Sequence, residues 1–179
     1  MNTAQRSIQQ YINAKDGNRP HLLDQAFTAD ATLDMVVRTG SISFPGHVEG
    51  REAIGDVLVR RFGQTFENVY TFCLGTPPPM AAKAFQCTWL VAMSDKHSGE
   101  VRVGCGMYDW QFEPESNLAE GLTITIEHMA TLPATDLAPV MAWASTLDYP
   151  WCNVHAVMNG LPDAAGLQAV LQYVAAEAL

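Results

Sequence analysis

The 179-residue sequence predicts a globular α+β fold: one domain, with a helical extension at its C-terminus. Apolar residues recur at helical spacing in the first third of the chain. From Glu67 to Leu132 the period changes to two, the alternation typical of half-buried strands. Hydrophobic residues make up 48% of the chain and charged residues only 16%, which excludes an intrinsically disordered protein.

The N-terminal third is expected to hold three helices and a hairpin. Thr3 is a suitable N-cap for the first helix, and Pro20 suits the first turn of the second. Pro45 and Gly46 interrupt the second strand of the hairpin. The expected helices span residues 4–14, 20–27 and 51–62, and the expected strands span residues 31–38 and 42–48.

Four longer strands are expected next, over residues 67–74, 84–94, 101–113 and 122–132. The segments between them read GTPPP, DKHSG and EPESN, which are turn-forming, so the strands predict an antiparallel meander. In the last strand, His128 is expected on the same apolar face as Ile126 and Ala130.

The strand over residues 101–113 is expected to be buried on both faces. Val103, Cys105 and Met107 lie on one face, and aromatic residues lie on the other: Tyr108, Trp110 and Phe112. An antiparallel strand of this kind needs a cover on its second face, either a partner subunit or the C-terminal segment. We expect a homodimer that pairs through the face of Val103.

Residues 133–179 are expected to form helices over 136–147, 151–158 and 163–178, the last one capped by Asp163. The last helix is apolar on most sides, so it is expected to be buried. The C-terminal helices are expected either to extend the dimer interface or to cover the mouth of a pocket.

Short motifs spread over residues 3–132 carry a resemblance to a known family. They are QQY in the first helix, LDQAFTADATL at the junction of the second helix and first strand, HVEGREAI before the third helix, and YDWQF followed by ITIEH in the late strands. In this order and spacing the chain resembles the nuclear transport factor 2-like superfamily, which includes ketosteroid isomerase, scytalone dehydratase and SnoaL-like polyketide cyclases. Residues 133–179 lie outside the resemblance, so we expect a superfamily domain over 1–132 and a helical extension over 133–179.

The resemblance implies a cone-shaped fold, in which a curved antiparallel sheet packs on the N-terminal helices around a deep apolar pocket. Five residues are expected to line that pocket and hold a small apolar ligand: Met35, Phe85, Trp89, Tyr108 and Trp110. For each of them, ordinary core packing is the alternative.

Three residues are candidates for catalysis. By its place in the resemblance, Tyr11 is a hydrogen-bond donor to a developing oxyanion. His128 is the candidate acid–base group. Met35 stands where the isomerase has its base, so Asp34 is a substitute base only if a bulge turns it inward. The Asp–His pair of the dehydratase branch is absent from the matching positions. The alternatives are core packing for Tyr11 and His128 and a solvated strand position for Asp34.

Composition and motifs exclude several other classes. The net charge of −9, with only Arg60 and Arg61 adjacent, speaks against a nucleic-acid partner. No apolar run is long enough to span a membrane, and no secretory signal is visible, so we expect a cytoplasmic protein. The four cysteines are expected to be reduced and buried. Neither a metal site nor a cofactor site is expected.

Two functional hypotheses follow. In the first, the protein is an isomerase, dehydratase or cyclase that works through Tyr11 and His128. In the second, it is a non-catalytic module of the same fold that binds a ligand or mediates assembly. The missing aspartate bases favour the second hypothesis.

Overall fold

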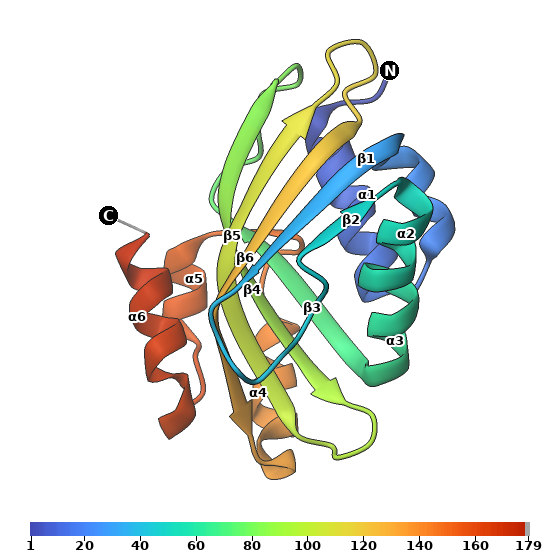
Figure 1. The fold of residues 1–179 in the computed structure, drawn as a ribbon. Helices are drawn as coiled ribbons and strands as arrows, with labels where there is room; N and C mark the ends of the chain where they lie inside the picture. The colour runs from blue at the N-terminus through green and yellow to red at the C-terminus, as the bar shows by residue number, and fades with distance from the viewer. Residues whose placement is uncertain (178–179) are drawn as a thin grey trace.

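A curved, seven-stranded sheet runs through the middle of the molecule, between two groups of helices (Figure 1). The structure is a computed structural model, and it describes residues 1–177. The strand order is β2-β1-β6-β5-β4-β3-β7, with β1 at Phe27–Val37, β2 at His47–Glu49, β3 at Phe66–Leu74, β4 at Ala84–Asp95, β5 at Val101–Phe112, β6 at Ala119–Leu132 and β7 at Trp151–Cys152.

Strands β3 to β6 form the antiparallel meander that the sequence predicts. The sheet as a whole is mixed, because β1 runs parallel to β6 and β7 runs parallel to β3. The expected strand over 42–48 shrinks to His47–Glu49, and residues 38–46 form a loop. Pro45 has no N–H for a strand ladder, which accounts for the short pairing.

The N-terminal helices cover the concave face of the sheet. Helix α1 spans Ala4–Asp16, and the hydroxyl of Thr3 accepts a hydrogen bond from the backbone N–H of Arg6, as its cap requires. The expected second helix is a 3₁₀ helix at Pro20–Gln25, and Phe27 already begins β1. The third is continuous and has three parts: α2 at Arg51–Gly55, a π-helical segment at Asp56–Arg61 and α3 at Phe62–Thr65.

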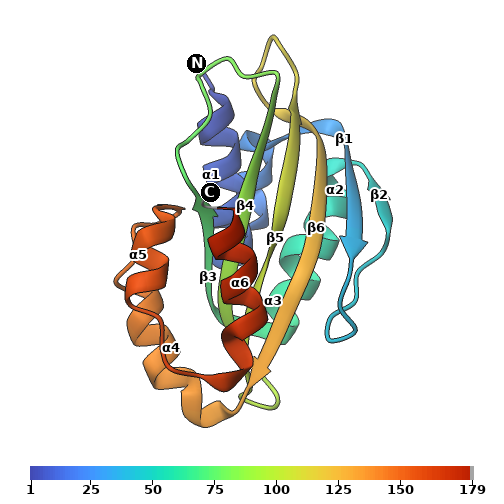
Figure 2. The ribbon, with the colours of Figure 1, turned by 90° about the vertical axis from the view of Figure 1, so that its left-hand side faces the viewer.

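The C-terminal segment covers the opposite, convex face of the sheet (Figure 2). It contains α4 at Leu137–Ala144, α5 at Val154–Asn159 and α6 at Gln168–Ala176, with 3₁₀ turns at Ala134–Asp136 and Ala165–Leu167. Helix α6 begins five residues later than expected, so Asp163 is not its cap, and the predicted end at Ala178 lies outside the described residues. Within residues 1–177, no helix combines the length and apolar character that a membrane span requires.

The sheet therefore separates two hydrophobic cores. Val103 and Cys105 of β5 are buried in the convex-face core with Val140, Val170 and Val174 of the C-terminal helices. Tyr108 and Trp110 of the same strand belong to the concave-face core. The expectation that β5 is buried on both faces is confirmed except at Met107, which is only partly buried and belongs to neither core. A homodimer is predicted from the sequence because the face of Val103 needs a cover. That argument is wrong, because the chain's own helices cover Val103 and Cys105.

Candidate functional site

The candidate site is a small apolar cavity between the concave face of the sheet and the N-terminal helices. Its volume is about 40 Å³, enough for a few water molecules and far below the several hundred Å³ of a typical ligand pocket. The drug-sized cavity predicted from the sequence is therefore absent from this conformation. The lining residues are Tyr11, Lys15, Met35, Ile42, Phe44, Leu58, Phe62, Thr71, Trp89, Val91, Met93, Tyr108, Ile124, Ile126 and Met129.

Tyr11 and Tyr108 bring two hydroxyl groups to this cavity. Their rings meet edge to face with centroids 5.9 Å apart, and both side chains are almost completely buried. Burial raises the pKa of the Tyr11 hydroxyl, and a hydrogen bond from Tyr108 works against that rise. Burial also raises the pKa of Tyr108. Both phenols are therefore neutral at physiological pH, and Tyr11 can donate its proton to a group in the cavity.

The other polar groups of the lining are also mainly donors. The indole N–H of Trp89 is buried, with no hydrogen-bond partner among residues 1–177. Lys15 reaches the cavity from the last turn of α1, where its ammonium lies 4.6 Å from the centre of the Phe62 ring. The lining residues that the structure describes include no carboxylate and no imidazole.

Lys15 belongs to a buried polar network beside the cavity. Its Nζ donates to Thr71 Oγ1 at 2.7 Å and to Asp16 Oδ1 at 3.1 Å, and the Thr71 hydroxyl donates to Asp16 Oδ1 at 2.8 Å. Asp16 Oδ2 accepts from the backbone N–H of Thr71 and from the hydroxyl of Tyr149, both at 2.7 Å. Each oxygen of this carboxylate thus has two donors, which compensate for its burial.

This network is not predicted from the sequence. Lys15 stands four residues after Tyr11, so helical periodicity places the two side chains on the same face of α1. The signal in the sequence is a lysine on an apolar helix face, but the predicted helix ends at residue 14 and so leaves Lys15 out. No sequence signal links Tyr149 to Asp16, because they lie 133 residues apart.

Two of the five predicted pocket residues, Phe85 and Trp110, do not line the cavity. Trp110 is fully buried behind Tyr11, with ring centroids 5.4 Å apart. Phe85 packs against Trp151 near the start of β4. The structure does place the other three in the lining, namely Met35, Trp89 and Tyr108.

Asp34 lies on the outer face of β1, with about half of its side chain exposed. Its carboxylate bonds to Nδ1 of His47 at 2.6 Å, and Nε2 of His47 lies 3.2 Å from Glu49. The register of β1 and β6 is regular at this point, so no bulge turns Asp34 inward.

His128 also points away from the cavity, because a bulge at Glu127 changes the alternation of β6. Cys105 pairs with His128 and Gly106 pairs with Ile126, so Glu127 is the extra residue. After the bulge, Met129 enters the cavity, and His128 packs on the convex side with its ring 6.0 Å from that of Tyr173 in α6. The expectation that His128 shares a face with Ile126 is wrong.

Two glycines of β5 shape the cavity floor. A Cβ on Gly104 would lie 2.4 Å from Cε of Met129, and a Cβ on Gly106 would lie 1.8 Å from the carbonyl oxygen of Thr125. The missing side chains therefore admit Met129 to the cavity and allow the close backbone approach at the bulge.

The loop over residues 38–46 forms the outer wall of the cavity. Ile42 and Phe44 are the lining residues that lie outside helices and strands, and both are partly exposed. The loop is tied to the sheet by Arg102, which donates to the carbonyl of Ser41 at 2.8 Å, and by the Ser41 hydroxyl, which donates to the carbonyl of Met129 at 2.9 Å.

Searches of family models and of curated proteins find no match. Solved structures do match. A hexachlorocyclohexane dehydrochlorinase superposes with a TM-score of 0.57 at 12% identity, covering 73% of this chain and 86% of its own. A computationally designed 17-OHP binder superposes with a TM-score of 0.53 at 13% identity, covering 69% and 92%.

A third structure, a Catenulispora acidiphila protein described as having a ketosteroid isomerase-like fold in complex with trimethylamine, matches with a TM-score of 0.50 at 17% identity, covering 66% of this chain and 82% of its own. The chain has the nuclear transport factor 2-like fold. The resemblance seen in the sequence is confirmed at the level of the fold. These structures are only 10–17% identical to the chain, so the likeness shows the fold and not the activity.

Relative to these nuclear transport factor 2-like structures, this chain is longer, since each of the three leaves at least 27% of it unmatched. Residues 1–177 contain no group of three or more His, Cys, Asp or Glu side chains placed to hold a metal ion. The four cysteines are free and buried.

Proposed function

We propose that the protein binds a small apolar molecule in the cavity beside Tyr11, and that the molecule presents a hydrogen-bond acceptor to the Tyr11 hydroxyl. One observation supports this most directly: two buried phenols lie together in a lining that is otherwise largely apolar. Tyr108 already donates to Tyr11, so a ligand without an acceptor would leave the Tyr11 donor unpaired, which costs free energy in an apolar site. The fold is also shared with a designed binder of 17-OHP and with a hexachlorocyclohexane dehydrochlorinase, both named for small molecules.

Binding requires the wall formed by the loop over 38–46 to move, because the cavity holds only a few water molecules. Ile42 and Phe44 come from this loop, and the rest of the lining comes from helices and strands. Outward movement of these two side chains opens space without unfolding the sheet. We therefore expect the loop to be the route of entry.

Catalysis is the second candidate function. The Tyr11 hydroxyl is placed to stabilise an oxyanion, which supports an isomerase, dehydratase or cyclase. Acid–base chemistry also needs a base, and His128 and Asp34 both lie away from the cavity. We propose ligand binding as the primary function for this reason. The free, buried cysteines support the cytoplasmic location, which stays a prediction.

The test uses the neutral ketone 4-phenylbutan-2-one as a probe, with isothermal titration calorimetry and protein-observed NMR. We expect binding that shifts resonances of Tyr11, Met35 and Ile124, and mass spectrometry of the native protein after purification is expected to show a bound apolar molecule. The proposal is overturned if 4-phenylbutan-2-one does not bind and mass spectrometry finds no bound molecule. Deuterium incorporation next to the ketone in D₂O, lost in Tyr11→Phe, would favour catalysis instead.

A further inference from the structure

Lys15 is the one charged residue among the described residues that line the cavity. Its side chain is 7% exposed, and two of its three N–H groups are used by Thr71 and Asp16. The third N–H has no hydrogen-bond acceptor among residues 1–177, and the ammonium lies 4.6 Å from the centre of the Phe62 ring, which lines the cavity. One charged donor is thus left for a group inside the cavity.

The charge of Asp16 is directed away from the cavity. Asp16 lines a separate, solvent-open groove of about 410 Å³, together with Arg19 and Tyr149, whereas Lys15 lines the cavity and not the groove. Oδ2 of Asp16 is held by the hydroxyl of Tyr149 and the N–H of Thr71 on that side. The ion pair is therefore a dipole whose positive end lies on the side of the apolar cavity, while its negative end lies on the side of the groove.

The other polar groups of the lining also favour a ligand that carries a hydrogen-bond acceptor. Tyr11 contributes a hydroxyl donor, and no carboxylate of the described residues lines the cavity. A neutral acceptor can use the Tyr11 hydroxyl, whereas an anion also gains from the charge of the Lys15 ammonium. Hydrogen bonds between charged partners are about twice as strong as neutral ones.

We propose that the cavity selects apolar molecules that carry one carboxylate group, with Lys15 as the anchor for that carboxylate. The proposal rests on the proposed function, since it assigns the chemical class of the ligand to the same cavity. The apolar part of the ligand lies along Met35, Ile124 and Ile126, toward the wall of Ile42 and Phe44. Asp16 and Tyr149 are positioning residues, because they act on the ligand only through Lys15.

The experiment compares 4-phenylbutanoate with 4-phenylbutanamide at pH 7.5 by isothermal titration calorimetry. The two molecules have nearly the same shape and differ in charge. We expect the wild-type protein to bind the carboxylate at least 10-fold more tightly than the amide. Lys15→Met is expected to bring the two affinities within about threefold of each other, which corresponds to losing a charged hydrogen bond.

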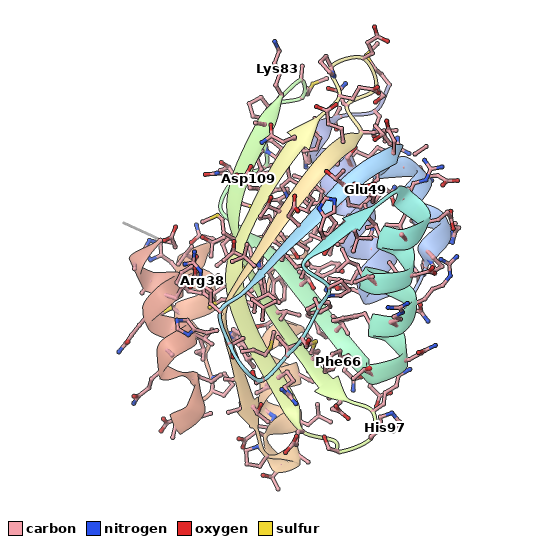
Figure 3. All side chains as sticks on the ribbon, in the orientation of Figure 1. Arg38, Glu49, Phe66, Lys83, His97 and Asp109 are labelled. Carbon is pink, nitrogen blue, oxygen red and sulfur yellow. The ribbon has the colours of Figure 1, made fainter. Side chains whose placement is uncertain are left out.

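Two further variants keep the test decisive. The double variant Lys15→Met with Asp16→Asn removes both charges and leaves no unpaired buried carboxylate, so it serves if the single variant folds poorly. Lys83→Met is the matched control, because Lys83 is exposed at the tip of the molecule, next to β4 and far from the cavity (Figure 3). This control is expected to keep the full preference for the carboxylate.

The outcomes separate the two proposals. If the amide and 4-phenylbutan-2-one bind but the carboxylate has no advantage, the anchor role of Lys15 is overturned and the proposed binding function stands. A carboxylate preference that survives in the double variant, or that is lost equally in Lys83→Met, also overturns the anchor. If none of the three molecules binds to the wild-type protein and mass spectrometry finds no bound molecule, both proposals fail.

Discussion

The hydroxyl of Tyr149 donates a 2.7 Å hydrogen bond to Asp16 Oδ2, and so joins the C-terminal segment to the end of the first helix. Asp16 in turn holds Lys15 at the cavity. The segment after residue 132, which lies outside the sequence resemblance, therefore takes part in organising the candidate site. Removing either partner of this hydrogen bond is expected to destabilise the protein. The cost is expected to be larger for the buried Asp16 than for the more exposed Tyr149.

Asp16→Asn is expected to destabilise the protein by about 3–5 kcal/mol, because it leaves the buried Lys15 ammonium without its counter-charge. Tyr149→Phe is expected to cost only about 1 kcal/mol, because Tyr149 is 42% exposed and water can replace its hydroxyl. Urea unfolding at pH 7 measures both. Equal costs for the two variants would contradict this account of the network.

Tyr11→Phe is expected to weaken binding of 4-phenylbutan-2-one about fivefold, the loss of roughly 1 kcal/mol for one neutral hydrogen bond. His128→Gln is the matched control, since His128 contacts Tyr173 on the opposite face of the sheet and leaves the affinity unchanged. Calorimetry on both variants checks the assignment. A loss of affinity in His128→Gln would show that His128 has access to the ligand.

Substitutions at the two glycines of β5 are expected to lower the stability of the protein by different amounts. Gly106→Ala places a Cβ against the backbone carbonyl of Thr125, which cannot move without breaking the sheet, so we expect a cost above about 3 kcal/mol or failure to fold. Gly104→Ala mainly meets the flexible end of Met129, and a cost of about 1–3 kcal/mol is expected. Adding Met129→Ala is expected to restore part of the stability of Gly104→Ala. Thermal unfolding of the three variants tests this order.

His47 predicts a pH dependence of stability. Hydrogen bonds to Asp34 and Glu49 raise its pKa in the folded state. Its contribution is therefore complete below about pH 6.5, the ordinary pKa of histidine, and disappears as the pH rises through the higher folded-state pKa. We expect His47→Gln to flatten the stability profile between about pH 6 and 8, and NMR titration of the imidazole to show the raised pKa. A wild-type protein whose stability depends on pH in the same way as that of the variant would contradict this prediction.

The C-terminal helix is expected to protect the convex face of the sheet. Val174 is fully buried in the same core as Cys105, so Val174→Asp places an unpaired charge there and detaches α6. The thiol of Cys105 is then expected to react with a maleimide reagent, as judged by peptide mass mapping. Ala176→Asp, at an exposed position of the same helix, is the control and leaves Cys105 unreactive.

The sequence by itself determined the class of fold, the meander of β3 to β6 and the burial of β5 on both faces. These follow from local patterns, because the alternation of Val103, Cys105, Tyr108 and Trp110 is a property of the strand alone. The same reasoning placed Tyr11 on the buried face of α1 and kept Asp34 on the outer side of β1.

Only the tertiary structure decided which residues meet at the cavity. One extra residue at Glu127 reverses the alternation of β6 and exchanges His128 for Met129, and a bulge leaves no clear trace in a hydrophobic pattern. The Lys15, Asp16, Thr71 and Tyr149 network joins residues up to 133 positions apart, and such contacts depend on how strands and helices pack. For the same reason, periodicity could show that β5 needs a cover, but only packing showed that the chain's own C-terminal helices provide it.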